Sequence, residues 1–260
     1  MRTLGRVLRW TVVGLLAITA LSLLGTWVHQ QRRHADASTA ALAASVSDAT
    51  VRIDDDCDLL VLRPVAGRER GGVILYPGAY VDIRGYVPTL KPIAAAGYRV
   101  VVVRMPFELA IFGIDRAADV IAANADVRRW VLVGHSVGGA MAAVFADRHR
   151  DALDGVIIWD SYPPSISSLA DYTKPVWLMH RATPDGAPPP AFAAQRHLYP
   201  RDSRWAAIPG GIHMQFGSFA PGGYEEDWAP LISEAEQHRI VVQLMREALG
   251  QMIGVAQALP

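Results

Sequence analysis

From residue 71 onward, short apolar runs alternate with segments whose apolar residues recur at helical spacing. Apolar runs rich in β-branched residues are typical of strands buried on both faces of a parallel sheet. The pattern predicts strands at 71–78, 98–106, 129–136, 155–160, 174–180 and 203–210, and helices at 86–96, 113–124, 137–147 and 230–252. Upstream, alternating runs at 49–54 and 57–64 predict a β-hairpin. This order predicts an α/β fold with a doubly wound, mostly parallel sheet in one domain, residues 49–260.

The N-terminal part has a different pattern. Residues 10–28 are 19 residues without a charge, bounded by arginines on both sides, and Trp10 and Trp27 lie near the two ends. As a helix they would span about 28 Å, close to the hydrocarbon thickness of a bilayer. We therefore expect a single-pass transmembrane anchor within residues 1–34. The basic residues before the run place the N-terminus in the cytoplasm and the domain on the extracytoplasmic side of the plasma membrane.

Two alternatives remain for this segment. The sequence "ADA" at 35–37 has the form of a signal-peptidase site, so the segment is alternatively a cleaved signal peptide, which would make the protein secreted. The run is alternatively a helix buried in the domain. Residues 35–48 are small and polar, and predict a linker or a weak helix between the anchor and the domain.

Composition narrows the classes of partner. The chain has 260 residues, with Lys+Arg and Asp+Glu both at 25 and a formal net charge of zero, so no global basic field attracts nucleic acid. The one cysteine, Cys57, allows no internal disulfide and no cysteine-based metal cluster. We expect a small-molecule ligand and neither a metal nor an organic cofactor. The sequence does not indicate an oligomeric state.

The candidate chemistry starts with a serine between two glycines. Ser136 lies in Gly134-x-Ser136-x-Gly138, between a predicted strand and a predicted helix. A tight strand-to-helix turn crowds the positions two before and two after its apex, where glycine relieves the crowding, and it lifts the apex hydroxyl clear of the sheet. A Gly-rich turn that only allows close packing is the alternative. The context favours Ser136 as a nucleophile.

A serine nucleophile requires a general base within hydrogen-bond reach. His213 lies in the glycine-rich loop "PGGIHMQFG" after the last predicted strand, where a solvent-accessible imidazole is expected. His180, which ends another predicted strand, is the alternative and a candidate pocket residue. We predict His213 as the base.

The base in turn requires a carboxylate that fixes its tautomer. Asp185, in "TPDGAP" after the strand at 174–180, gives the chain order serine, aspartate, histidine that this arrangement favours. Asp160, at the end of "VIIWD", is the alternative acid. We predict Asp185 as the acid.

Two backbone N–H groups would stabilise an oxyanion in such a site. The N–H of Val137, directly after the serine, is one, and the loop after the first parallel strand supplies the other, from Ala79 with Gly78 as the neighbouring position. Tyr80 and Glu108 follow the ends of two strands and are predicted to line the pocket.

The segments "YPGAYVD", "GYRVVVVRMPFELA", "VLVGHSVGGAMAA", "TPDGAP" and "GGIHMQFG" occur in an order that resembles the alpha/beta hydrolase fold-5 family, a dienelactone-hydrolase-like branch of the α/β-hydrolases. The resemblance covers about residues 50–250. It implies the α/β-hydrolase fold, with Ser136, Asp185 and His213 on the family's nucleophile, acid and base, and an N-terminal membrane segment as in many members. Glu108 stands where the family motif usually has an asparagine, and the serine replaces the cysteine of dienelactone hydrolases proper.

These features together predict a membrane-anchored serine hydrolase that acts on ester-type bonds of a small acyl substrate. A carboxylesterase is the first expectation, and a thioesterase or lactonase would use the same groups. The alternative is a catalytically inactive, hydrolase-like binding protein tethered to the membrane. Only about 14 residues separate the strands at 155–160 and 174–180, which leaves no room for a large lid and predicts an open, shallow pocket.

Overall fold

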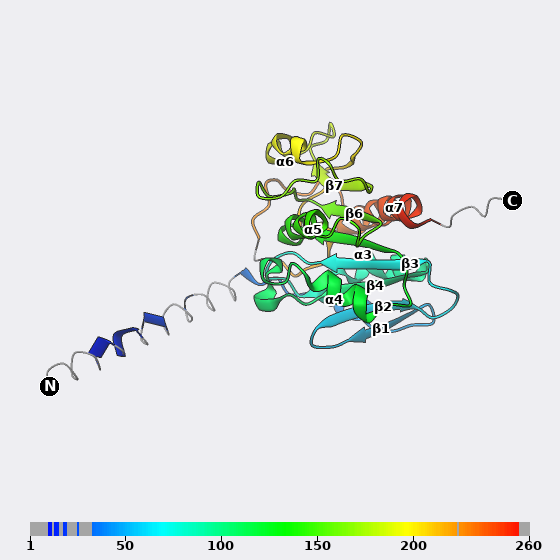
Figure 1. Cartoon of the computed structure of the whole chain (residues 1–260), viewed down its shortest axis with the longest axis horizontal. Coiled ribbons are helices and arrows are strands. Elements are labelled where there is room, and N and C mark those ends of the chain that lie inside the picture. Colours follow the sequence, from blue (N-terminus) through cyan, green and yellow to red (C-terminus); the bar gives the residue numbers. More distant parts are fainter. Residues whose placement is uncertain are drawn as a thin grey trace.

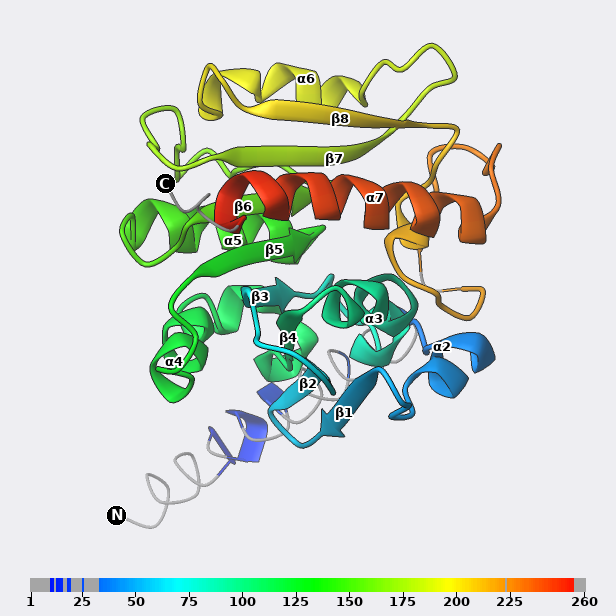
Figure 2. The ribbon, with the colours of Figure 1, turned by 90° about the vertical axis from the view of Figure 1, so that its right-hand side faces the viewer.

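The computed structural model describes residues 10, 11, 13–15, 18, 19, 25, 33–222 and 224–254. One eight-stranded sheet forms the centre of the domain (Figure 1), in the order β1-β2-β4-β3-β5-β6-β7-β8 (Figure 2). The strands are β1 Val51–Asp55, β2 Leu59–Pro64, β3 Gly71–Tyr76, β4 Tyr98–Val103, β5 Trp130–His135, β6 Gly155–Trp159, β7 Val176–Ala182 and β8 Arg204–Pro209. The β1–β2 hairpin joins the rest antiparallel, and β3 to β8 are mutually parallel. The predicted mostly parallel α/β sheet is therefore confirmed.

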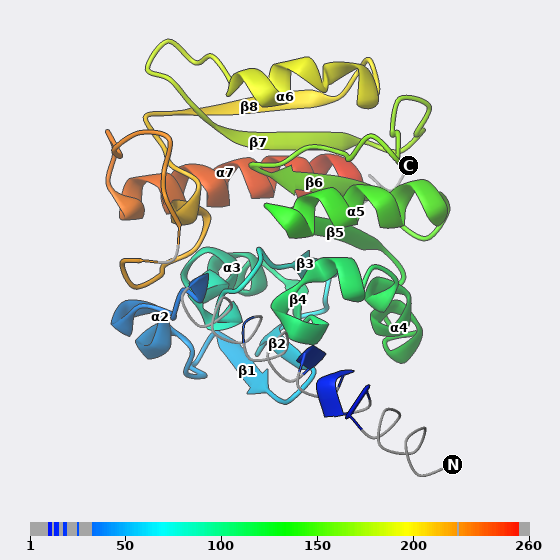
Figure 3. The same cartoon turned by 90° about the vertical axis from the view of Figure 1, so that its left-hand side faces the viewer.

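Helices cover both faces of this sheet. Helices α3 (Val87–Ala95) and α7 (Glu234–Ile253) pack on one face (Figure 2), and α4 (Arg116–Ala123) and α5 (Val137–Arg148) on the other (Figure 3). Alternate residues of each central strand enter the two apolar cores, because successive side chains of a strand point to opposite faces. The long C-terminal helix begins at Glu234, later than predicted, because the Ser233 side chain caps it by accepting a hydrogen bond from Glu236 N.

Short elements complete the domain. The helices α2 (Thr39–Ala44) and α6 (Pro190–Ala194) lie at opposite ends of the sheet (Figure 2). The 3₁₀ helices are η1 Ile83–Tyr86, η2 Pro106–Glu108, η3 Ala110–Phe112, η4 Arg196–Leu198 and η5 Met214–Phe216. Four of them, η1, η2, η3 and η5, lie in loops that follow the carboxyl ends of β3, β4 and β8, so these loops are built of compact turns.

The segment predicted as a linker, residues 35–48, packs on the domain. Ala35 exchanges hydrogen bonds with the loop after β3, from its N–H to Tyr80 O (2.8 Å) and from Asp82 N to its carbonyl (2.9 Å). Ala35, Ala37 and Ala41 are buried, and Ala41 belongs to α2. The weak helix of the prediction is present as α2, and the residues before it are part of the folded domain.

Most of the predicted anchor, residues 1–34, lies outside the described residues. Among the residues that the structure does describe, no helix is long and apolar enough to cross a membrane. The described residues of this segment include Trp10, Leu15 and Ile18, which are exposed, so these side chains are not buried in the domain as the third alternative required.

Unusual backbone conformations concentrate at the carboxyl edge of the sheet. Among the described residues, the non-glycine residues with positive φ are Tyr80, Phe107, Glu108, Ser136 and Asp160. They follow β3, β4, β5 and β6, whose carboxyl ends lie at the same edge. Such conformations are costly for residues with a Cβ atom and are retained mainly where function requires them. We therefore expect the functional site at this edge of the sheet.

Candidate active site

Ser136 stands at the apex of a tight turn between β5 and α5. Its backbone angles are φ 54° and ψ −125°, which a side-chain-bearing residue rarely adopts. A Cβ atom added at Gly134 would lie 2.3 Å from Gly138 O, and one at Gly138 would lie 2.2 Å from Tyr76 O. Only glycine fits at both positions, so the turn has the strained geometry that the spacing of the motif predicted.

His213 reaches the same place from the loop after β8. Its Nδ1 atom lies 2.6 Å from Oδ2 of Asp160, and both residues are almost completely buried, at 5% and 2% exposure. His213 and Ser136 line the same cavity. Because Nδ1 faces the carboxylate, Nε2 is the nitrogen left to exchange a proton.

The carboxylate that contacts His213 is thus that of Asp160. The prediction that Asp185 occupies this position is wrong. Asp185 lies in an exposed turn after β7, where its carboxylate accepts a hydrogen bond from the Thr183 hydroxyl. The reason is the length of β7, which continues to Ala182 and carries that turn past the site. The shorter strand β6 ends at Trp159, and Asp160 follows it with a φ of 47°.

Arg181 holds this carboxylate in its charged form. The Arg181 N–H donates to Asp160 Oδ1 (2.9 Å), and the guanidinium, itself buried, forms ion pairs with Asp160 and with Asp227. Burial alone would raise the pKa of Asp160, but the hydrogen bond with His213 and the positive charge of Arg181 outweigh it, so this pKa lies below its ordinary value. Asp160 is therefore ionised at neutral pH and suited to stabilise an imidazolium.

A second loop, before α7, fixes the backbone that carries His213. The Glu226 carboxylate accepts hydrogen bonds from His213 N (2.9 Å) and Met214 N (2.7 Å), and Trp228 Nε1 donates to Gly211 O (2.9 Å). The Tyr224 ring stacks on the His213 ring with centroids 4.5 Å apart. None of these residues was singled out in the sequence, because a polar loop without periodicity gives no local signal.

The predicted oxyanion positions divide into two kinds. Gly78 donates its N–H to the Tyr86 hydroxyl (2.9 Å) and is thereby engaged. Ala79 and Val137 line the cavity of Ser136 and His213, as does Tyr80. Gly78 lines this cavity too. Since its N–H is already engaged, Ala79 and Val137 stay the predicted donors.

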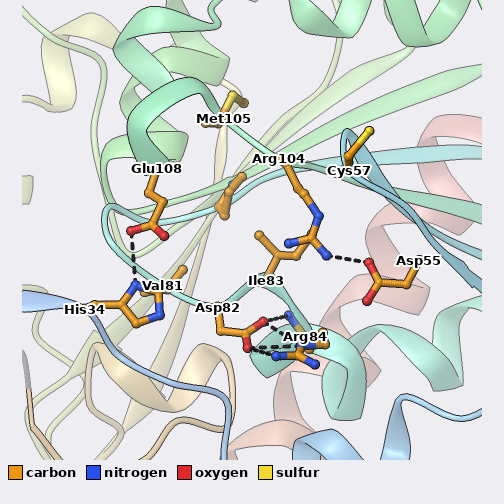
Figure 4. A pocket seen from close by; sticks show the side chains of 12 residues that line it. His34, Asp55, Cys57, Val81, Asp82, Ile83, Arg84, Arg104, Met105 and Glu108 are labelled. Atoms are coloured by element: carbon orange, nitrogen blue, oxygen red, sulfur yellow. Dashed lines mark hydrogen bonds and ion pairs between the residues drawn. The ribbon is translucent and has the colours of Figure 1, made fainter. Parts of the chain in front are cut away.

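His180 and Glu108, the other two predicted pocket residues, lie outside the cavity that Ser136 and His213 line. His180 is buried, its Nδ1 is 2.8 Å from Arg181 O, and its ring packs edge-on against Trp205. Burial lowers the pKa of His180, which favours its neutral form. Glu108 contacts His34, with 3.0 Å between Oε2 and Nδ1 (Figure 4). Neither residue lines the cavity of Ser136, but Glu108 lines the neighbouring hollow beyond Gly78.

Three hollows meet at this edge. A cavity of ≈ 300 Å³ lies beside Ser136 and His213 and is lined largely by apolar side chains, among them Leu109 and Met214. A second, of ≈ 480 Å³, borders the same two residues on the side of Tyr162 and Phe192. The third, of ≈ 560 Å³, lies beyond Gly78 and is lined by ion pairs such as Arg84–Asp82 and Arg104–Asp55 (Figure 4). Ser136 and His213 thus border two apolar hollows, and the Tyr224 ring stacks on His213.

The described residues contain no group of three or more His, Cys, Asp or Glu side chains that could hold a metal ion. Cys57 is exposed in the turn between β1 and β2. The structure thus brings a serine, a histidine and an aspartate, Ser136, His213 and Asp160, together at the carboxyl edge of the sheet.

Comparison with known proteins agrees with the fold. A sequence profile described as the alpha/beta hydrolase family matches residues 72–239, more than half of the chain. None of the curated proteins matches the chain in sequence.

Solved structures share the architecture at low sequence identity. A ferulic acid esterase from Streptomyces cinnamoneus is 21% identical, with a TM-score of 0.55 over 74% of this chain and 69% of that one. A soluble variant of monoglyceride lipase from Saccharomyces cerevisiae is 12% identical, with a TM-score of 0.57 over 80% and 97%. Est1E from Butyrivibrio proteoclasticus is 15% identical, with a TM-score of 0.53 over 78% and 100%. At such identities the likeness establishes the fold.

Proposed function

Because the chain belongs to the alpha/beta hydrolase family, we propose that it is a serine hydrolase that cleaves an ester-type bond of a small acyl substrate. The observation that carries the proposal is the hydrogen bond between His213 and Asp160, formed beside the strained Ser136 in one cavity. The esterase and lipase names of structurally similar proteins support an ester as the substrate.

The mechanism follows from the positions of these groups. Ser136 Oγ attacks the substrate carbonyl carbon while His213 Nε2 accepts the hydroxyl proton, and Asp160 stabilises the resulting imidazolium. The N–H groups of Val137 and Ala79 donate to the oxyanion of the tetrahedral intermediate. The intermediate collapses as the C–O bond breaks, and the departing alkoxide takes the proton from His213.

Water completes the cycle. His213 removes a proton from the water as its oxygen attacks the acyl-enzyme, and returns that proton to Ser136 Oγ when the acid leaves. Thioesters and lactones react through the same steps, so a carboxylesterase is proposed first, with thioesterase and lactonase activity as variants.

Covalent labelling tests the proposal. The full chain should react with a fluorophosphonate probe, and Ser136→Ala should abolish the label while leaving the thermal unfolding temperature close to that of the wild type. A folded wild-type chain that neither labels nor hydrolyses short p-nitrophenyl esters contradicts the proposal. That result would favour the inactive binding protein instead.

We also propose that residues 10–28 anchor the enzyme in the plasma membrane with the domain on the extracytoplasmic side. The uncharged length of this run and the exposure of Trp10, Leu15 and Ile18 support an apolar environment for it. Alkaline phosphatase fused after residue 260 should be active only if the domain is exported. N-terminal sequencing of the mature protein separates an anchor from a cleaved signal peptide.

A further inference from the structure

Three large apolar side chains are exposed beside the catalytic cavity. Phe107, Ile111 and Phe112 are 71%, 46% and 58% exposed, and they come from η2 and η3 in the loop between β4 and α4. The rings of Phe107 and Phe112 pack edge-to-face with centroids 5.5 Å apart, so they form one surface. We refer to these three residues as the apolar rim. Exposed apolar clusters of this kind usually mark an interaction site.

The loop holds the apolar rim in a fixed place. Phe107 and Glu108 adopt successive positive φ angles of 54° and 58°, a conformation that solvent exposure alone would not favour. Glu108 O accepts a hydrogen bond from Tyr80 N (3.1 Å), which joins the loop to the predicted oxyanion loop. Leu109, between the two 3₁₀ helices, lines the cavity of Ser136. The apolar rim is therefore rigidly connected to the mouth of the catalytic cavity.

The N-terminal segment enters the domain at the same place. His34 contacts Glu108, the neighbour of Phe107, with 3.0 Å between Nδ1 and Oε2 (Figure 4). Arg33 and Ala35 line the cavity that contains Ser136. Figure 1 shows the described residues before 33 on the side of the domain toward which the carboxyl end of β3 points. The uncharged run ends at Val28, and the five residues 29–33 span at most about 18 Å.

We infer that the apolar rim inserts into the surface of the lipid bilayer that holds residues 10–28, so that the catalytic cavity opens toward the membrane. This inference rests on the anchoring proposed above. A bilayer fits better than a protein partner, because an anchor that ends within that short distance of His34 brings the rim to the membrane without any further binding energy. The substrate class that follows is an ester dissolved in, or part of, the membrane.

A fluorescent probe on the rim tests the inference without using activity. In the full chain carrying Cys57→Ser, Phe112→Cys is labelled with nitrobenzoxadiazole and reconstituted into phosphatidylcholine vesicles that contain some phosphatidylglycerol. Val65→Cys is the matched control, since Val65 is 56% exposed and follows β2 at the opposite edge of the sheet. Ile111→Cys is a second rim variant in case Phe112→Cys fails to fold.

The expected result is a blue-shifted emission from the rim probe and its quenching by lipids with spin-labelled acyl chains, with neither effect at residue 65. If the protein floats with the vesicles but the rim probe behaves like the control, the inference is wrong and the anchoring stands. If the protein does not float with the vesicles, both the proposed anchoring and the insertion of the apolar rim are wrong. Fluorophosphonate labelling of the same samples tests separately whether Ser136 is reactive. A failure of the proposed hydrolase activity is therefore distinguished from a failure of the membrane inference.

Discussion

The hydroxyl oxygen of Tyr86 lies 2.8 Å from Nδ1 of His135. Tyr86 also accepts a hydrogen bond from Gly78 N (2.9 Å), and His135 Nε2 lies 3.1 Å from His213 O. A carbonyl oxygen only accepts, so Nε2 carries the proton and Nδ1 accepts from Tyr86. One buried chain of hydrogen bonds therefore connects the oxyanion loop, the turn of Ser136 and the loop of His213.

We expect Tyr86→Phe to weaken both stability and catalysis. The change leaves the N–H of Gly78 and Nδ1 of His135 without partners in a buried site, which costs about 1–3 kcal/mol for each unsatisfied group. Urea unfolding and kcat on p-nitrophenyl acetate measure the two effects. Tyr172→Phe is the control, because the buried Tyr172 hydroxyl has no hydrogen-bond partner in the described part of the chain. Equal losses of unfolding free energy and of kcat in Tyr86→Phe and Tyr172→Phe would contradict the proposed role of Tyr86.

The identity of the acid is tested by two amide substitutions. Asp160→Asn should lower kcat/KM by on the order of 10⁴-fold, because the imidazolium loses its charged partner and the tautomer of His213 is no longer fixed. Asp185→Asn should leave kcat/KM close to the wild type, since its carboxylate contacts Thr183 in an exposed turn. Ester hydrolysis under identical conditions measures both. A large loss in Asp185→Asn alone would restore the original prediction.

Local pattern was sufficient for most of the sheet and for two of the three side chains that the structure brings together at the candidate site. Ser136 and His213 were found because glycine spacing and position after a strand are visible in the sequence. The choice between Asp160 and Asp185 depends on where β7 ends and on the contact of Arg181 with Asp160, and both are tertiary features. The packing of residues 35–38 on two loops also lacks a local signal, because small residues fit a linker and a tight interface equally well.

Glu226 is expected to act as a positioning residue for the His213 loop. Glu226→Ala removes both acceptors from His213 N and Met214 N and should lower kcat about tenfold, which corresponds to roughly 1.4 kcal/mol. Glu226→Gln keeps one acceptor oxygen and should recover part of the loss, with KM nearly unchanged. Glu225→Gln, at the exposed neighbouring residue, serves as the control. Identical kcat values for Glu226→Ala and the control would exclude the positioning role.

Stability should decrease as the pH falls from neutral. Burial lowers the pKa of His135 well below its ordinary value, so the folded protein keeps this imidazole neutral. The unfolded chain binds a proton there below about pH 6.5, and the extra proton favours unfolding from that pH down to the lower folded-state pKa. The free energy of unfolding, measured with urea across this range, should therefore fall with decreasing pH. His135→Asn should reduce the slope of this dependence, whereas His197→Asn, at an exposed histidine, should leave it unchanged. A slope that is unchanged in His135→Asn would show that other groups cause it.

The segment 35–38 should be required for a competent site, because it joins the oxyanion loop to the loop that follows His213. Ala35 pairs with Tyr80 and Asp82, Ser38 N donates to Ser218 O (3.0 Å), and Ala220 N donates to Asp36 O (2.8 Å). Deleting residues 1–38 removes these bonds and exposes apolar surface, so both the melting temperature and kcat on a water-soluble ester should fall. Deleting residues 1–32 retains the segment and should leave both values near those of the full chain in detergent. If the two deletions give the same melting temperature and the same kcat, residues 35–38 are only a linker, as the sequence predicted.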